Sequence, residues 1–199
     1  MLTLLSDRLI PYTGPNLRSG WIEATFGLPG EALVAWLGPC HVATADLVDL
    51  DDQRAGAEIH AALMLHFLAE HPGDELFRTV LRQRLLVAEA LEILRDFPAA
   101  EGLRREGDDL YLSPPLLQGE GAGGGASPRK LSVSIATLSP RSGLIHFAVN
   151  VDPTGAPVPA VGLHELGVDP ADFARRLLER YATEMAGVAA ACLKVREVE

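Results

Sequence analysis

The chain has 199 residues, 48% of them hydrophobic, which is enough for one domain with a substantial core. A formal net charge of −10 argues against a nucleic-acid partner, because an acidic surface repels the phosphate backbone. The sequence has no apolar run of membrane-spanning length and no start typical of a secretory signal, and Cys40 lies far from Cys192. We therefore expect a single soluble domain over residues 1–199, in the cytoplasm, with reduced thiols and no membrane partner.

Residues 1–44 predict short strands and loops, followed by a longer strand. Gly and Pro are frequent in the first 30 residues, where we interpret the apolar piece Trp21–Phe26 as part of a short strand. Residues 31–44 are strongly apolar and predict a buried strand. We expect that strand to end at Gly38-Pro39 and to resume after it.

The middle of the chain contains the most regular helical pattern. An acidic cluster, Asp46–Asp52, comes first, and residues 55–71 then fit a helical face and a buried strand equally well. Apolar residues recur at helical spacing from about Asp74 to Phe97 and predict a long amphipathic helix. Asp74 is its expected N-cap, and Pro98 ends it.

The last part of the chain predicts strands, a loop and a helix. Residues 107–113 predict a short strand, and the glycine-rich stretch 118–128 has too few apolar groups to pack, which predicts a flexible loop. Residues 129–137 and 143–152 then predict the two strands of an antiparallel hairpin. A final amphipathic helix is expected to have Asp169 as its N-cap.

The use of lysine draws attention to the first strand of this hairpin. Lys and Arg together number 17, yet only Lys130 and Lys194 are lysine. Lys130 lies within the patterned strand, whereas Lys194 lies in a polar tail. A lysine kept in a strand of an arginine-rich chain suggests a site that needs a compact ammonium group. We therefore expect a small-molecule pocket around Lys130.

Strand alternation gives Lys130 a set of polar neighbours. In the first hairpin strand Lys130, Ser132 and Ser134 point to one side, and in the second strand His146 and Asn150 do the same. If the two strands pair antiparallel, these side chains lie on one surface, which suits a polar ligand or a phosphate. The alternative is that this surface is the solvated side of an antiparallel sheet.

Other polar residues are candidates for ligand binding as well. Asp108 and Asp109 precede the hairpin and could hold an amine or a ligand hydroxyl, although paired aspartates are also typical of turns. Arg82 could bind an anion or could be a solvated cation of the helix. His66 is a further ligand-binding candidate. With Glu70 it has the spacing of a metal-binding pair, but no third ligand lies close in the sequence, so we expect no metal site.

Three segments in chain order, GDDLYL, RKLSVSIA and HFAVNV, resemble the central part of the biotin and lipoate protein ligases. Asp108 and Asp109 fall on the first ligase motif, and Lys130 falls on the essential lysine. His146 and Asn150 fall on the third motif. Over the whole chain, segments such as YTGPNLRSGW, GPCHV and MLHFLAE resemble the domain-of-unknown-function family 366.

The ligase resemblance implies an α+β fold with a central antiparallel or mixed sheet and flanking helices. It also implies a small-molecule carboxylic acid or its adenylate as the ligand, with ATP and Mg²⁺ as cofactors. In that family the lysine lies against the acyl phosphate, so the resemblance implies that Lys130 is the catalytic residue that stabilises charge there.

Two parts of the ligase and octanoyltransferase patterns are missing. The glycine-rich arginine motif that binds nucleotide is absent, and residues 156–163, which follow the third motif, lack the cysteine nucleophile of the octanoyltransferases. Two functions therefore stay open: an enzyme that activates or transfers an acyl group, and a non-catalytic module that binds a small molecule or nucleotide in the same cavity. A homodimer stays open too.

Overall fold

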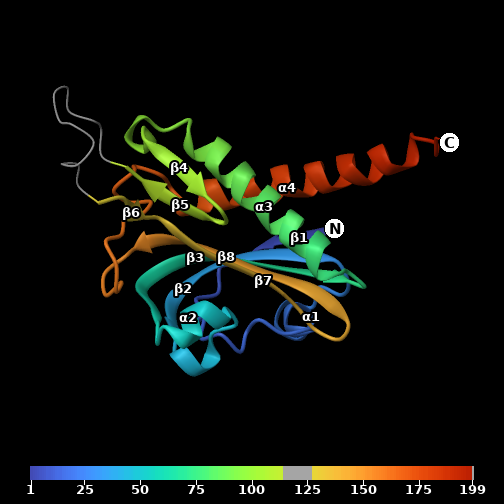
Figure 1. Ribbon diagram of the computed structural model, residues 1–199. Coiled ribbons are helices and arrows are strands. Elements are labelled where there is room, and N and C mark those ends of the chain that lie inside the picture. Colours follow the sequence, from blue (N-terminus) through green and yellow to red (C-terminus); the bar gives the residue numbers. More distant parts are fainter. Residues whose placement is uncertain (114–126, 199) are drawn as a thin grey trace.

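The computed structural model describes residues 1–113 and 127–198, and its centre is a mixed five-stranded sheet in the order β1-β2-β3-β8-β7 (Figure 1). β1 and β2 run parallel, and the other neighbouring strands run antiparallel. The strands of this large sheet are β1 (Leu2–Leu5), β2 (Ala32–Val42), β3 (Ile59–Pro72), β7 (Ser132–Leu138) and β8 (Ser142–Asp152). The predicted hairpin is thus confirmed, as is the predicted α+β class with a mixed sheet.

A small antiparallel sheet and helices complete the fold. The small sheet consists of β4 (Leu103–Glu106), β5 (Asp109–Leu112) and β6 (Arg129–Lys130). The α-helices of the described ranges are α1 (Trp21–Phe26), α2 (Leu50–Arg54), α3 (Leu76–Leu94) and α4 (Pro170–Leu193), with short 3-10 helices at Thr44–Asp46 and Pro98–Ala100. Figure 1 shows α3 and α4 on one face of the large sheet and α1 and α2 on the other. Within those ranges, none of the helices is both long and apolar enough to cross a bilayer.

Both faces of the large sheet are buried, and this decides the ambiguous segment 55–71. On the side of α3 and α4, Phe67 of β3 packs against Phe173, and on the other side Trp36 packs against Trp21. β3 lies between β2 and β8 and is covered on both faces. A strand in that position has a nearly continuous apolar sequence, which periodicity alone does not distinguish from a buried helix.

β2 does not end where the sequence predicted. The strand continues through Gly38-Pro39, with a bulge between Gly38 and Cys40 in its pairing with β3. Gly38 is required because the main chain of Ile10 passes so close that a Cβ at position 38 would lie 1.8 Å from the Ile10 carbonyl oxygen. The glycine therefore allows a close approach of two segments instead of breaking the strand.

The predicted boundaries of the long helix were too wide. α3 begins at Leu76 and ends at Leu94, whereas the sequence predicted about 74–97. Asp74 is not its N-cap: Glu75 holds that position and makes no side-chain cap hydrogen bond. The Asp74 carboxylate pairs with the guanidinium groups of Arg78 and Arg82 instead. Ion pairs with two arginines of α3 have therefore replaced the cap.

Local signals set the ends of two other helices. Trp21–Phe26, predicted as strand, form α1, which lies between Gly20 and Gly27; both glycines are left-handed, with φ of 74° and 72°. The predicted cap of α4 is confirmed, because the Asp169 carboxylate accepts a hydrogen bond of 2.7 Å from the backbone N–H of Asp172. The sequence did not predict α2 or β4.

Candidate functional site

A cavity of about 760 Å³ lies against the face of the large sheet that is opposite α3 and α4. We call it the sheet cavity. The segment from η1 (Thr44–Asp46) through α2 to the start of β3 lines it on one side, and residues of the small sheet line it on another. Side chains from β3, β7 and β8 contribute Met64, Val133, Ile135, His146 and Asn150.

Lys130 lies at the edge of this cavity and is held by both sheets. Its cross-strand neighbour on β5 is Tyr111, and its backbone N–H donates to the carbonyl of Pro159 at 2.8 Å. Its Nζ is 2.7 Å from Oδ2 of Asp109 and 5.8 Å from the centre of the Tyr111 ring. The Lys130 side chain is only 27% exposed, so the ammonium is held in a defined place.

The pKa values of both partners in this ion pair are raised, which favours the charged form of Lys130 and disfavours that of Asp109. Burial disfavours the charge on Lys130, but the Asp109 carboxylate outweighs it and raises the pKa of the lysine. Burial also raises the pKa of Asp109, and here the neighbouring ammonium does not compensate fully. Oδ1 of Asp109 is buried and has no hydrogen-bond partner among residues 1–113 and 127–198. Lys130 therefore keeps its positive charge, whereas one oxygen of the Asp109 carboxylate lacks a hydrogen-bond partner within the described residues.

His146 forms part of a buried hydrogen-bonded pair with His66. The His66 Nε2 lies 3.1 Å from the Gly38 carbonyl oxygen, which can only accept, so Nε2 carries the proton. His66 Nδ1 then accepts from His146 Nε2 at 3.1 Å. Burial lowers the pKa of His66 to about 4 and holds that of His146 well below its usual value, so both rings are neutral near pH 7. Tyr12 stacks on His146, with 3.6 Å between ring centres.

Asn150 fixes β8 to the segment that carries Lys130. Its side-chain Nδ2 donates to the Lys130 carbonyl at 3.2 Å, and its backbone N–H donates to the carbonyl of Leu131 at 2.9 Å. Asn150 is only 6% exposed and lines the sheet cavity. The predicted proximity of Lys130 and Asn150 is therefore present in the structure.

The predicted orientation of the two serines is wrong. In the register of β7 and β8, Ile135 stands opposite His146, and Val133 shares its face. Ser132 and Ser134 consequently face α3, on the other side of the sheet from His146.

The physical cause is an irregularity between β6 and β7, where Leu131 belongs to neither strand. One residue outside the strand register reverses the alternation that the sequence predicted through residues 129–137. The Ser132 hydroxyl accepts from the backbone N–H of Leu110 at 2.9 Å, and the Ser134 hydroxyl accepts from Gln83 at 2.9 Å. Both hydroxyls thus serve the packing of α3 and the small sheet, although Ser134 also borders the cavity.

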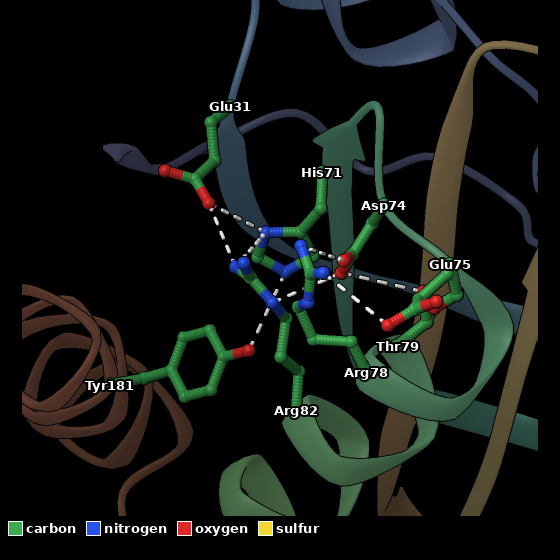
Figure 2. Close-up of polar contacts among 8 residues, drawn as sticks. All are labelled: Glu31, His71, Asp74, Glu75, Arg78, Thr79, Arg82 and Tyr181. Carbon is green, nitrogen blue, oxygen red and sulfur yellow. Dashed lines mark hydrogen bonds and ion pairs between the residues drawn. The ribbon is translucent and has the colours of Figure 1, made fainter. Parts of the chain in front are cut away.

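Arg82 lies in a separate group of charged residues between α3, β3 and α4 (Figure 2). Its Nη1 is 2.9 Å from Oε1 of Glu31 and 2.8 Å from Nδ1 of His71, and its Nε is 3.0 Å from Oδ2 of Asp74. The hydroxyl of Tyr181, from α4, reaches His71 at 3.5 Å. All hydrogen bonds and ion pairs of Arg82 within the described ranges are to protein groups of this cluster, so the structure gives it a role in joining elements.

The other predicted candidates have different environments. Asp108 lines the sheet cavity and accepts from Gln83 Nε2 at 2.8 Å. His66 lies beneath the cavity and reaches it only through His146. Glu70 accepts from the hydroxyl of Ser142 at 2.8 Å and does not approach His66 as a second ligand.

Several residues that line the cavity were not predicted from the sequence. Tyr12 is distant in sequence and enters the site through its stacking on His146. Asp46, Asp49 and Asp52 also line it; the acidic cluster was visible in the sequence, but nothing local connected it to the hairpin.

Comparison with known proteins identifies two levels of similarity. A solved protein of unknown function from Pyrococcus horikoshi is 36% identical, covers 99% of this chain and 98% of its own, and superposes with a TM-score of 0.84. An uncharacterised protein of Methanocaldococcus jannaschii is 31% identical over 191 residues, covering 92% of this chain and 79% of its own.

More distant structures share the fold alone. A mutant biotin protein ligase of Aquifex aeolicus, solved in complex with biotin, is 14% identical, with a TM-score of 0.53 over 94% of this chain and 70% of its own. A lipoate protein ligase of Thermoplasma acidophilum is 16% identical, with a TM-score of 0.50 over 94% of this chain and 84% of its own. The resemblance to the biotin and lipoate ligases seen in three motifs is thus confirmed as a likeness of fold. Residues 1–196 match the model of the family described as "Domain of unknown function (DUF366)", and the chain belongs to that family.

Proposed function

We propose that this protein binds a small carboxylic acid, or an activated acyl derivative of one, in the sheet cavity, and that Lys130 holds the acyl oxygens. The observation that carries the proposal is the ammonium of Lys130, which is largely buried at the cavity edge and 2.7 Å from Asp109. A cation in such a place stabilises a carboxylate, or the negative charge that develops on a carbonyl oxygen during acyl transfer. Asp109 orients the lysine.

The rest of the cavity supports a ligand with an apolar body. Apolar side chains line it beside the charged groups, and they include Val42, Leu47, Ile59, Met64 and Val158. Small-molecule sites typically combine such a lining with a few convergent polar groups. The aliphatic part of an organic acid would lie against these side chains.

The residues present do not fit the triphosphate of ATP. Among the described residues that line the cavity, Lys130 is the one Lys or Arg against six carboxylates. The stretch 114–126 contains neither Lys nor Arg. Nucleotide phosphates are held by several cations or by backbone N–H groups at a helix N-terminus. We therefore favour an acyl group that arrives already activated over one that is adenylated here.

In the enzymatic form of the proposal, an N–H or O–H acceptor attacks the acyl carbonyl carbon directly. The carbonyl oxygen becomes negative and Lys130 stabilises it. The bond to the leaving group then breaks, and the leaving group departs with the electron pair and takes up the proton that the acceptor loses. An acyl-enzyme on Cys40 is not supported, because burial raises the pKa of its thiol to about 12 and the residue is only 1% exposed. This lack of an activated thiol also favours a second candidate, a binding module without catalysis.

Binding tests the first part of the proposal. Calorimetric titration with octanoate, lipoate and biotin would be made on the wild type, Lys130→Ala and Lys194→Ala. Lys194 is the matched control, because it is the other lysine of the chain and caps the end of α4. We expect Lys130→Ala to weaken binding about tenfold or more, the value of a lost charged hydrogen bond, and Lys194→Ala to leave it unchanged. If Lys130→Ala and Lys194→Ala bound the ligands with equal affinity, the role of Lys130 would be rejected.

Catalysis needs a separate readout. Hydroxylamine traps an activated acyl group as a hydroxamate, so the bound acid would be supplied either with ATP and Mg²⁺ or as its thioester. Hydroxamate formation from the thioester alone, above the uncatalysed rate and reduced in Lys130→Ala, would identify an acyltransferase. Formation from the free acid and ATP would contradict our inference about the nucleotide, and binding without either reaction would identify the binding module.

A further inference from the structure

His146 presents a hydrogen-bond acceptor to the sheet cavity. Its Nε2 is committed as the donor to His66, so the neutral ring has its lone pair on Nδ1. The residue is only 3% exposed and lines the cavity, and its one side-chain hydrogen bond within residues 1–113 and 127–198 is the one from Nε2 to His66. An acceptor at a cavity wall forms a hydrogen bond when a ligand supplies an N–H or O–H group.

Asn150 offers a second acceptor further along the same strand. Its Nδ2 donates to the Lys130 carbonyl, which leaves Oδ1 as the free end of the amide. Asn150 is four positions after His146, so the two lie about 13 Å apart along β8. Since Asn150 adjoins Lys130, an elongated ligand with its acid group at Lys130 can place its other end near His146.

The charge of the lining favours a cation at that other end. Among the described lining residues, Lys130 is the one Lys or Arg, and its ammonium pairs with Asp109. Five further carboxylates line the cavity: Asp46, Asp49, Asp52, Glu58 and Asp108. Charge of one sign along the walls of a cleft concentrates ligands of the opposite sign. The acceptor of His146 and the negative charge of the cavity lining select for the same chemical group, a protonated amine.

We propose that the sheet cavity takes a carboxylic acid that also carries an amino group, with the carboxylate at Lys130 and the ammonium at His146. The proposal rests on the acid-binding function proposed above and specifies its substrate class. A saturated fatty acid of the same length fills the same apolar space but leaves the acceptor of His146 unsatisfied.

Three ligands of one chain length separate the two ends of the site: ω-aminooctanoate, octanoate and octylamine. In calorimetric titration, the protein should bind ω-aminooctanoate at least about tenfold more tightly than octanoate. His146→Phe keeps an aromatic ring beneath Tyr12 and removes the acceptor, so this preference should fall towards parity. His146→Gln retains an acceptor oxygen and should restore part of the preference.

A charge variant covers the case in which His146→Phe does not fold. Asp46 and Asp52 are exposed on the cavity wall, so Asp46→Asn/Asp52→Asn is expected to fold. It should weaken ω-aminooctanoate severalfold and spare octanoate.

The outcomes test the acid site at Lys130 and the amine site at His146 separately. Equal affinity of octanoate and ω-aminooctanoate for the wild type would overturn the amine site and leave the acid site standing. Octylamine binding as tightly as ω-aminooctanoate would support the amine site and reject Lys130 as the acid site. If none of the three ligands binds, the amine site is rejected, and the titrations with lipoate and biotin decide the acid site.

Discussion

Acidification from pH 7 to pH 4 should remove about 3 kcal/mol of stability through His66. The ring is fully buried beside Gly38 and His146, and burial lowers its pKa from 6.5 to about 4. Between those two values the unfolded chain binds a proton that the folded chain does not, so the free energy of unfolding falls as the pH falls. At about 1.4 kcal/mol per pH unit, the interval corresponds to about 3.4 kcal/mol. His146, whose pKa is also lowered, acts in the same direction.

Urea unfolding followed by tryptophan fluorescence, at several pH values from 7 to 4, measures this effect. Carboxylates titrate in the same range, so the informative quantity is the difference between wild type and His66→Gln, which cannot protonate at that position. The variant should show a shallower loss of stability, while His164→Gln, at an exposed site, should follow the wild type. Parallel curves for wild type and His66→Gln would refute the assignment of the slope to His66.

Three further predictions concern packing and reactivity. Arg82→Met should cost about 1–3 kcal/mol in urea unfolding, because the buried Asp74 loses its Nε partner and keeps only Arg78, and it should not change ligand affinity in the sheet cavity; a weaker ligand affinity would show that Arg82 belongs to the site. Gly38→Ala should cost about 3 kcal/mol or more, since its Cβ would meet the Ile10 carbonyl oxygen at 1.8 Å, and an unchanged urea midpoint would contradict the close approach. A thiol reagent should modify the exposed Cys192 quickly and the buried Cys40 only on unfolding; two fast thiols in the native protein would contradict the burial of Cys40.

The acidic lining of the sheet cavity argues against the ATP site that the ligase resemblance implied. The ligase resemblance implied ATP, but one ammonium among six carboxylates is poorly suited to a triphosphate. The fold is shared with the biotin and lipoate ligases, whereas the charge of the cavity is a property of this chain. Fold and chemistry therefore have to be argued separately.

Local patterns determined much of the secondary structure. The hairpin of β7 and β8, the helix α3 and the Asp169 cap follow from spacing within a few residues, and the sequence predicted each of them. Composition alone singled out Lys130. The likeness to the ligase fold was also visible in three short motifs. In the structure those segments form adjacent strands around the cavity.

The tertiary structure decided which side chains meet. Most of the ambiguous segment 55–71 lies in β3 (Ile59–Pro72), and it is a strand because both faces of β3 are covered, a property that its own spacing does not encode. The irregularity at Leu131 turns Ser132 to the opposite face, and no local rule placed it there. Tyr12 and the acidic segment 46–52 reach the site only through the order of strands in the sheet. Alternation and helical spacing are properties of neighbouring residues, whereas a cavity is formed by segments that only the complete sheet brings together.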